Sequence, residues 1–415
     1  MSLIPQSLEI RVSTLTACVV IAAAGLAASC GRAAALPRLP DTTRGIHLAM
    51  VFDYAVPPEF RFAGIDAVWS AARPVAGRPS FYYVPFERDL RNDHSPQWWE
   101  ANHPDWIEYR CDGQWATEFG HPDAPLDIAN PAVRQWQWSH EILPALKRGY
   151  QGIAFDNLNL TNDHARCGHY DSSGNWVNQY AGPGGLERYQ QDVLSWARYM
   201  RDQLHQAGQL MGINYSYTPE VSRSLNLTLM SLPDLLFDEA GVTNNGAVND
   251  NVVSYAKWQQ IFGAARQIES DGVCYELNGE EPQETRSIPL NEREWIIANY
   301  LLIKGSCTFV YITGYRVDTS QFNPVQPGGL VQDYGDYYPF PEYRLRVGAP
   351  LAPPRSWAGL WSRPYAGGLV LVNPTDGSRR YRTRRPLYPL GTFSRAHRFV
   401  VAAHTALILL NRPAG

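Results

Sequence analysis

Five short apolar segments of this chain end in the same way, with an aromatic residue followed at once by a carboxylate. The clearest is the segment 152–156, GIAFD, and its relatives end at Asp53, Glu87, Asp238 and Glu276. A carboxylate at the end of a buried strand is costly unless it is paired or has a chemical role. In a parallel barrel, the carboxyl ends of all strands meet at one rim. The repetition therefore predicts a parallel barrel with acidic residues gathered at that rim.

The remaining sequence supplies the other strands and the helices that such a barrel needs. We expect strands at 46–52, 64–69, 80–85, 152–155, 210–215, 232–237, 273–275 and 308–312. Helical spacing of apolar residues is found at 132–147, 186–207, 252–270 and 291–304, with Asn291 as the expected cap of the last helix. Eight strands alternating with helices predict an α/β fold of the (β/α)8 TIM-barrel type. A doubly wound open sheet is the alternative, although no GxGxxG or P-loop sequence follows an early strand.

The pattern of the sequence changes at about Leu351. Pro353-Pro354 is followed by short strands separated by turn residues, with no helical period. We expect three parts: a leader at 1–40, the barrel at 41–348, and a small antiparallel β-sandwich at 349–415.

The N-terminal segment has the features of an export signal. Arg11 precedes an apolar run from Leu15 to Ala28, which is short for a membrane span. The sequence that ends at Cys30 resembles a bacterial lipobox, and 33–35 is an alternative cleavage site. We predict a protein that is periplasmic, extracellular or attached to a membrane through lipidated Cys30.

Export permits disulfides, and four cysteines remain beyond the leader. Cys111 and Cys167 lie in long polar loops at the expected rim and are a plausible pair. Cys274 and Cys307 lie in expected strands and are predicted to be buried thiols. No CxxC or His-x-His sequence is present, so we expect no metal site and no cofactor. The net charge of −4 argues against a nucleic-acid partner. We expect a monomer.

Alternation along the strands predicts which side chains face the barrel interior. In the fourth strand, Ile153 and Phe155 are expected to face the helices and Asp156 to face the mouth. The same phase predicts outward Phe52, Phe86 and Phe237, and inward Asp53, Glu87 and Asp238.

Cleavage of a glycosidic bond needs two carboxylates, one that donates a proton and one that attacks or activates water. The fourth and sixth strands are separated by one strand, so acids at their ends can flank a sugar ring. We therefore predict a glycoside hydrolase in which Asp156 pairs with Asp238, with Glu239 and Glu276 as competing second carboxylates. A non-catalytic glycan-binding lipoprotein on the same barrel is the main alternative. A metal-dependent barrel hydrolase is the other, and the absence of His-x-His counts against it.

The expected ligand is a carbohydrate, because aromatic planes pack on the apolar face of sugar rings and the chain holds 13 Trp and 23 Tyr. Polar and aromatic residues of the rim and its loops are the candidates for binding it. The predicted substrate-binding residues are Asp53, Tyr54, Glu87, Asn157, Asn159, Asn214, Tyr215, Tyr275, Trp98 and Trp176.

Four motifs carry a family resemblance: HPDWIEYRCDG at 103–113, LDIANPAVRQW at 126–136, GYQGIAFDN at 149–157 and LLFDEAG at 235–241. Together they resemble bacterial hypothetical glycosyl hydrolases with a TIM barrel, of the endo-α-1,4-polygalactosaminidase type, and more distantly the α-galactosidase clan. In that clan the fourth-strand aspartate is the nucleophile of a retaining mechanism and a sixth-strand aspartate is the acid/base. The resemblance implies the first role for Asp156 and the second for Asp238 or Glu239. Ala154 stands where the α-galactosidase clan has a lysine.

Overall fold

Eight parallel strands form one sheet in the computed structural model, and this sheet closes into a ring. The structure describes residues 35–52, 64–89, 94–118, 123–239, 241–244, 251–318, 330–332 and 335–414. The strands are β1 (Leu48–Phe52), β2 (Ile65–Ser70), β3 (Phe81–Pro85), β5 (Gly152–Asp156), β8 (Leu210–Asn214), β9 (Leu235–Asp238), β10 (Cys274–Glu281) and β11 (Thr308–Gly314). They neighbour one another in chain order, and β11 pairs with β1.

The ring closes between β2 and β3 through one parallel bridge, Val68 with Ser80. The backbone nitrogens of Val68 and Ala71 donate to the carbonyls of Pro79 and Phe81, each at 3.0 Å. The predicted (β/α)8 barrel is therefore confirmed.

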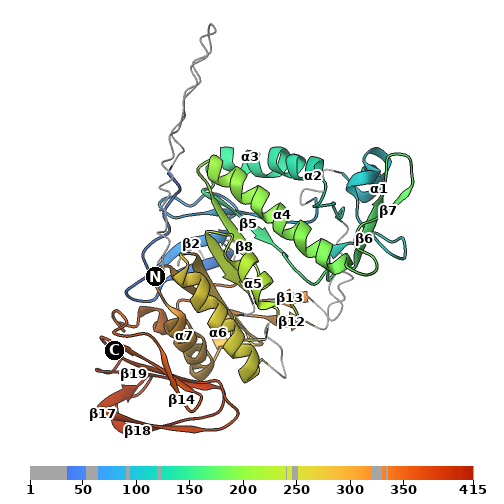
Figure 1. Ribbon diagram of the computed structural model, residues 1–415. Helices are drawn as coiled ribbons and strands as arrows, with labels where there is room; N and C mark the ends of the chain where they lie inside the picture. The colour runs from blue at the N-terminus through green and yellow to red at the C-terminus, as the bar shows by residue number, and fades with distance from the viewer. Residues whose placement is uncertain are drawn as a thin grey trace, which may run out of the picture. The chain divides into compact units, whose positions relative to one another are not determined.

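Helices lie between the later strands, as the apolar spacing predicted (Figure 1). They are α2 (Pro131–Trp136), α3 (Leu143–Lys147), α4 (Gly185–Gln206), α5 (Arg223–Met230), α6 (Tyr255–Ser270) and α7 (Leu290–Ile303). A π-helical segment, Gln137–Ile142, joins α2 to α3. The short α5 was not predicted. The expected cap at Asn291 is wrong, because α7 begins one residue earlier, after Pro289. No described helix is long and apolar enough to cross a bilayer.

The ring of Trp69, on β2, lies in the interior of the barrel. A Cβ added at Gly212 of β8 would lie only 2.5 Å from this ring. Position 212 therefore requires glycine. Because β2 and β8 stand across the ring from each other, this contact passes through the interior. The Trp69 ring also lies 5.2 Å from that of Phe237, between centroids, so Phe237 points inward. The prediction that Phe237 faces outward and Asp238 inward is therefore wrong.

For the fourth strand the predicted phase holds. The ring of Phe155 lies 4.8 Å from that of Trp196 on α4, so it faces the helices, and Asp156 faces the interior. Phe86 likewise packs on Trp196, at 5.3 Å between centroids. The predicted side-chain directions are therefore correct for Phe155 and Phe86, which pack on the helix α4. They are reversed for β9, where Phe237 packs on Trp69 inside the barrel.

Two insertions after β3 and β5 build a small subdomain with its own apolar core, here called the rim subdomain (residues 94–118, 123–130 and 157–184). It contains α1 (Pro96–Asn102) and an antiparallel sheet of β4 (Tyr109–Arg110), β6 (Arg166–Tyr170) and β7 (Trp176–Asn178). A disulfide between Cys111 and Cys167 joins the two insertions, with the Cα atoms 5.2 Å apart.

A second disulfide links Cys274 to Cys307, so the prediction of buried thiols is wrong. Strands β10 and β11 are neighbours in the ring, and their first residues bring these two Cα atoms to 4.7 Å.

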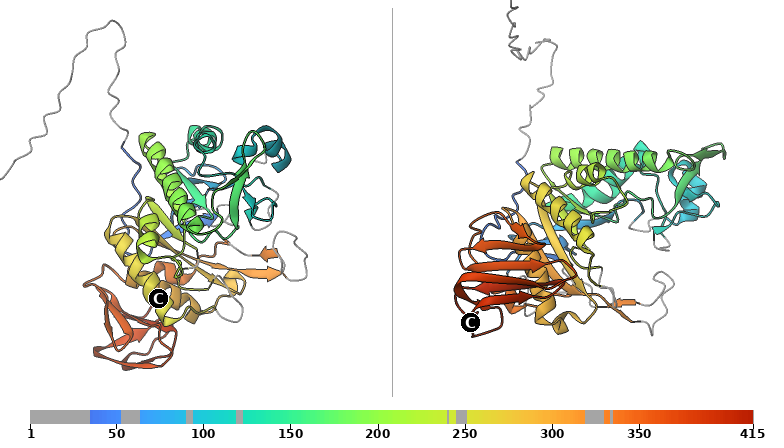
Figure 2. Two further views of the ribbon diagram at one scale, coloured as in Figure 1. Left: turned by 45° about the vertical axis from the view of Figure 1, so that its right-hand side comes forward. Right: turned by 60° about the horizontal axis from the view of Figure 1, so that its bottom comes forward.

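The C-terminal residues form an antiparallel sheet that folds over its own apolar core, which confirms the predicted β-sandwich (Figure 2). Its strands are β14 (Arg355–Trp357), β15 (Leu360–Tyr365), β16 (Gly368–Asn373), β17 (Arg379–Pro389), β18 (Ala396–Val401) and β19 (Thr405–Leu410). A small hairpin of β12 (Arg316–Asp318) and β13 (Leu330–Gln332) precedes it. The sheet packs on α7, where the Ile408 nitrogen donates to Glu294 Oε1 at 2.5 Å. The boundary at residue 349 stays a prediction, as does the leader, since residues 1–34 lie outside the described part.

Candidate active site

Two carboxylates at the barrel mouth share one hydrogen-bond donor. Asp156 ends β5, and Glu239 follows the last residue of β9. Asn214 ends β8 between them, and its Nδ2 donates to Asp156 Oδ1 at 2.7 Å and to Glu239 Oε2 at 2.6 Å. Because one nitrogen lies 2.7 Å from the first oxygen and 2.6 Å from the second, these oxygens are at most 5.3 Å apart. The structure thus places the fourth-strand acid Asp156 close to Glu239, one of the two acids predicted at the end of the sixth strand.

A second donor holds Asp156 from the other side. The hydroxyl of Tyr83, on the neighbouring strand β3, donates to Asp156 Oδ2 at 2.7 Å. The next residue, Asn157, has φ of +63°, a left-handed conformation that asparagine tolerates better than most residues. The strand thus ends abruptly at Asp156, whose two oxygens each accept a hydrogen bond.

The side chain of Asp238 points away from the mouth. It is buried and accepts hydrogen bonds from Ser216 Oγ and Tyr275 Oη, both at 2.6 Å, and from the Gly241 nitrogen at 3.1 Å. These donors connect the end of β9 to the loop after β8 and to the beginning of β10. Tyr275 is fully buried beside Asp238, so it does not reach the mouth as predicted.

Glu276 faces the interior but lies too deep to reach the mouth. Its register partners are Phe237 and Phe309, and it is fully buried. Within the described residues, neither of its carboxyl oxygens accepts a hydrogen bond. Burial raises the pKa of Glu276 well above its ordinary value.

Strand β10 is longer than predicted and carries a further acid, Glu280, to the mouth. Asn278 Nδ2 donates to Glu280 Oε1 at 3.1 Å and to the Glu239 carbonyl at 3.3 Å. Burial and the charge of Glu239 raise the pKa of Glu280 well above its ordinary value. Burial together with Glu280 and Glu239 raises the pKa of Tyr315 to about 12.

The rim subdomain contributes an acid that the sequence did not single out, Glu118. Asn157 Nδ2 donates to its Oε2 at 3.1 Å, and Arg88 Nε lies 2.8 Å from the same oxygen. Burial and the neighbouring Glu87 raise the pKa of Glu118 to about 8. Glu118 follows a loop without periodicity, so no pattern in the sequence marked it.

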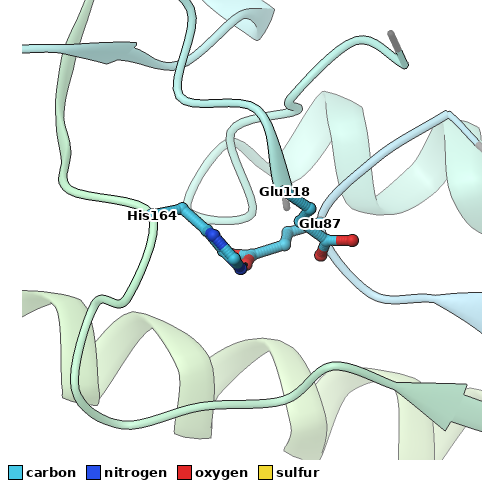
Figure 3. Close-up of side chains that lie close together, drawn as sticks. All are labelled: Glu87, Glu118 and His164. Carbon is cyan, nitrogen blue, oxygen red and sulfur yellow. The ribbon is translucent and has the colours of Figure 1, made fainter. Parts of the chain in front are cut away.

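Glu87 lies beneath the mouth, fully buried, with Arg166 Nε 2.8 Å from its Oε2. His164 Nε2 lies 3.6 Å from Glu87 Oε1, and Figure 3 shows Glu87, Glu118 and His164 side by side. Burial, Arg166 and Arg88 lower the pKa of His164 to about 4, so its imidazole is neutral at pH 7. Arg166 pairs with Glu87 and Arg88 with Glu118, so each of these two carboxylates already has a protein cation.

An open pocket of about 490 Å³ lies over the ends of β5, β8 and β9. It is lined by Asn157, Leu158, Asn159, Thr161, Asp163, His164, Asn214, Tyr215, Ser216, Thr218, Glu220 and Glu239. Four predicted binding residues, Asn157, Asn159, Asn214 and Tyr215, are among them. Of the predicted carboxylates, Glu239 is the one that lines this pocket.

The other predicted binding residues lie elsewhere. Asp53 and Tyr54 lie outside the described residues. Trp98 on α1 and Trp176 on β7 are 37% and 40% exposed on the rim subdomain, and neither lines the pocket. Glu87 is fully buried, and two residues that line the pocket lie against its Oε1: the Asn159 amide at 3.5 Å and His164 Nε2 at 3.6 Å.

No family model matches the sequence, and no curated protein is significantly similar to it. Among solved structures, a MutB mutant in complex with its substrate sucrose superposes with a TM-score of 0.53 at 11% identity, over 90% of this chain and 100% of that chain. A trehalulose synthase mutant in complex with Tris gives a TM-score of 0.52 at 10% identity, over 89% of this chain and 100% of that chain. At these identities the similarity shows that the chain shares the barrel fold of those enzymes.

Proposed function

We propose that this protein is a glycoside hydrolase that cleaves O-glycosidic bonds of an oligosaccharide or polysaccharide, with Asp156 and Glu239 as its two carboxylates. The observation that carries the proposal is the single Asn214 amide between these two acids, at the edge of an open pocket on the barrel mouth. Active sites of TIM-barrel enzymes lie at this face. Two facing carboxylates are the machinery that glycoside hydrolysis requires.

The roles follow from the surroundings of each acid. The two-carboxylate mechanism needs one ionised carboxylate and one that carries a proton. Tyr83 and Asn214 both donate to Asp156, which suits the ionised nucleophile. Glu239 lines the pocket beside the buried Glu280, which suits the proton donor that protonates the leaving oxygen.

The spacing of the pair favours retention of configuration. Retaining enzymes hold their carboxyl groups about 5–5.5 Å apart, whereas inverting enzymes leave about 6.5–9.5 Å for a water molecule. The oxygens that Asn214 bridges, Asp156 Oδ1 and Glu239 Oε2, lie within 5.3 Å of each other, which favours the closer arrangement. We therefore propose a glycosyl-enzyme intermediate on Asp156.

We also propose that the enzyme is exported as a monomer, with Cys30 as the site of lipid attachment. Every cysteine in the described residues is in a disulfide, and disulfides persist in oxidising compartments. Mass spectrometry of the mature protein tests the attachment: an acylated N-terminal Cys30 is expected, and an N-terminus at residue 36 would contradict it.

The test of the activity is a glycan screen with purified wild type, Asp156→Asn and Glu239→Gln. Both isosteric variants are expected to lose turnover by about 1,000-fold or more while folding normally, because each removes one half of the two-carboxylate mechanism. Asp163→Asn, on the pocket rim, is the matched control and is expected to retain turnover. Unchanged turnover in Asp156→Asn would overturn the proposal. Glycan binding by wild type without any turnover would favour the non-catalytic alternative.

A further inference from the structure

A second group of potential ligands lies in the rim subdomain, apart from the pocket. It consists of Glu108, just before β4, Asp127, and His169 on β6. One ligand atom from each of the three lies within 4.8 Å of the other two. Asp127 Oδ2 and His169 Nδ1 are 3.5 Å apart. Glu108 and Asp127 are each 1% exposed, so both carboxylates are buried, and the His169 side chain is partly exposed.

Several polar atoms in and beside this cluster have no hydrogen-bond partner among the described residues. Both oxygens of Glu108 lack a partner among the described residues, as do His169 Nδ1 and the neighbouring Gln179 Oε1. A buried polar atom without a partner typically costs about 1–3 kcal/mol. Four such atoms of ligand type in one place indicate that something else satisfies them.

The nearby protein cations are directed elsewhere. Arg166 makes its contacts with the carboxylate and carbonyl of Glu87 and with the Leu126 carbonyl. Arg134 donates to the Ile128 carbonyl and to Ser195 Oγ. The charges of both arginines reach the cluster through space, but neither donates a hydrogen bond to Glu108 or Asp127 in these contacts.

We propose that Glu108, Asp127 and His169 bind a divalent transition-metal ion, with Zn²⁺ as the best fit. Two ligands at about 2.1 Å from a tetrahedral ion lie about 3.4 Å apart, which matches the 3.5 Å between Asp127 Oδ2 and His169 Nδ1. The imidazole favours Zn²⁺ over Ca²⁺, which takes six to eight oxygen ligands. The fourth position is left to water or to Gln179 Oε1.

The partners around Asp127 support this assignment. Gln179 Nε2 donates to Asp127 Oδ2 at 2.8 Å, and the Ala129 nitrogen donates to Oδ1 at 2.8 Å. Such outer hydrogen bonds orient the ligands of metal sites.

The ion would join the same two insertions as the disulfide Cys111–Cys167. Glu108 and Asp127 come from the insertion after β3, and His169 comes from the insertion after β5. The site stabilises the subdomain that carries Glu118 and does not depend on the proposed glycosidase activity.

The experiment uses the whole protein, purified without a histidine tag, stripped with EDTA and titrated with ZnCl₂ by calorimetry. We expect one Zn²⁺ per chain and a rise in the melting temperature on binding. Since removal of an outer partner already weakens metal sites about 10- to 100-fold, Glu108→Gln and His169→Asn are expected to weaken Zn²⁺ binding by about 100-fold or more.

His164→Asn, in the cluster of Glu87 and Glu118, is the matched control and is expected to bind Zn²⁺ as tightly as wild type. Absence of Zn²⁺ binding in the folded wild type would overturn the proposal. Loss of binding in His164→Asn with retention in His169→Asn would move the ion to the other cluster and would equally overturn it. Circular dichroism of each variant separates loss of ligand from loss of fold.

Discussion

The hydroxyl of Tyr83 and the carboxylate of Asp156 face each other across neighbouring strands, 2.7 Å apart. The parallel register that pairs Tyr83 with Ala154 carries the long phenol forward to the end of β5. The aspartate is therefore held by one donor from β3 and another from β8.

Tyr83→Phe should lower kcat by about 10- to 100-fold with little change in KM, because the phenyl ring fills the same space but leaves Asp156 Oδ2 without its donor. Steady-state kinetics on the substrate found in the glycan screen measures this. A fall in melting temperature without a fall in kcat would assign Tyr83 a purely structural role.

Asn214→Ala removes the amide between the two acids. We expect kcat to fall by about 100-fold or more, because both Asp156 and Glu239 lose a donor and the pair loses its spacing. The pH dependence of kcat is a second readout, because in this variant no shared amide offsets the repulsion between the two acids. Asn159→Ala, which lines the same pocket without touching Asp156, should instead raise KM. Equal effects of the two variants on kcat would contradict this division.

Glu294, at the contact between α7 and the C-terminal sheet, should make the protein less stable as pH rises. Burial raises the pKa of Glu294 to about 8, well above its unfolded value near 4.5. Between these values the folded state binds more protons than the unfolded state, so the free energy of unfolding falls with rising pH, by at most about 1.4 kcal/mol per pH unit from this group. Glu294→Gln should flatten the slope between pH 5 and 8 in denaturant titrations. Glu187→Gln, on the exposed side of α4, should leave the slope unchanged.

Gly212→Ala should destabilise the protein by about 1–3 kcal/mol, because the added methyl group would lie 2.5 Å from the ring of Trp69. Gly263→Ala in α6 is the matched control. A Cβ at Gly263 meets nothing within 4 Å, and alanine favours a helix by about 1 kcal/mol over glycine. The two variants should thus shift the denaturation midpoint in opposite directions. A shift in the same direction would show that Trp69 moves aside at little cost.

The sequence was sufficient to predict the barrel because its strands show as separate apolar runs, five of which end in an aromatic residue followed by a carboxylate. It was not sufficient to decide between Asp238 and Glu239. Two consecutive residues face opposite sides, and the choice depends on Trp69, which lies far away in the chain and draws Phe237 inward. Glu118 was not predicted because its loop shows no periodic pattern of apolar residues. The disulfide between Cys274 and Cys307 was not predicted because it depends on which strands are neighbours in the ring.

The closure between β2 and β3, with one bridge and two backbone hydrogen bonds, is a seam in an otherwise well-paired ring. One side of this closure is β2, which carries Trp69 with its ring in the barrel interior. The other side is β3, which carries Tyr83, the donor to Asp156. An opening of the seam would therefore loosen the interior and release the aspartate in one motion. Amide hydrogen exchange at Val68 and Ala71 reports on the stiffness of the candidate active site without any substrate present.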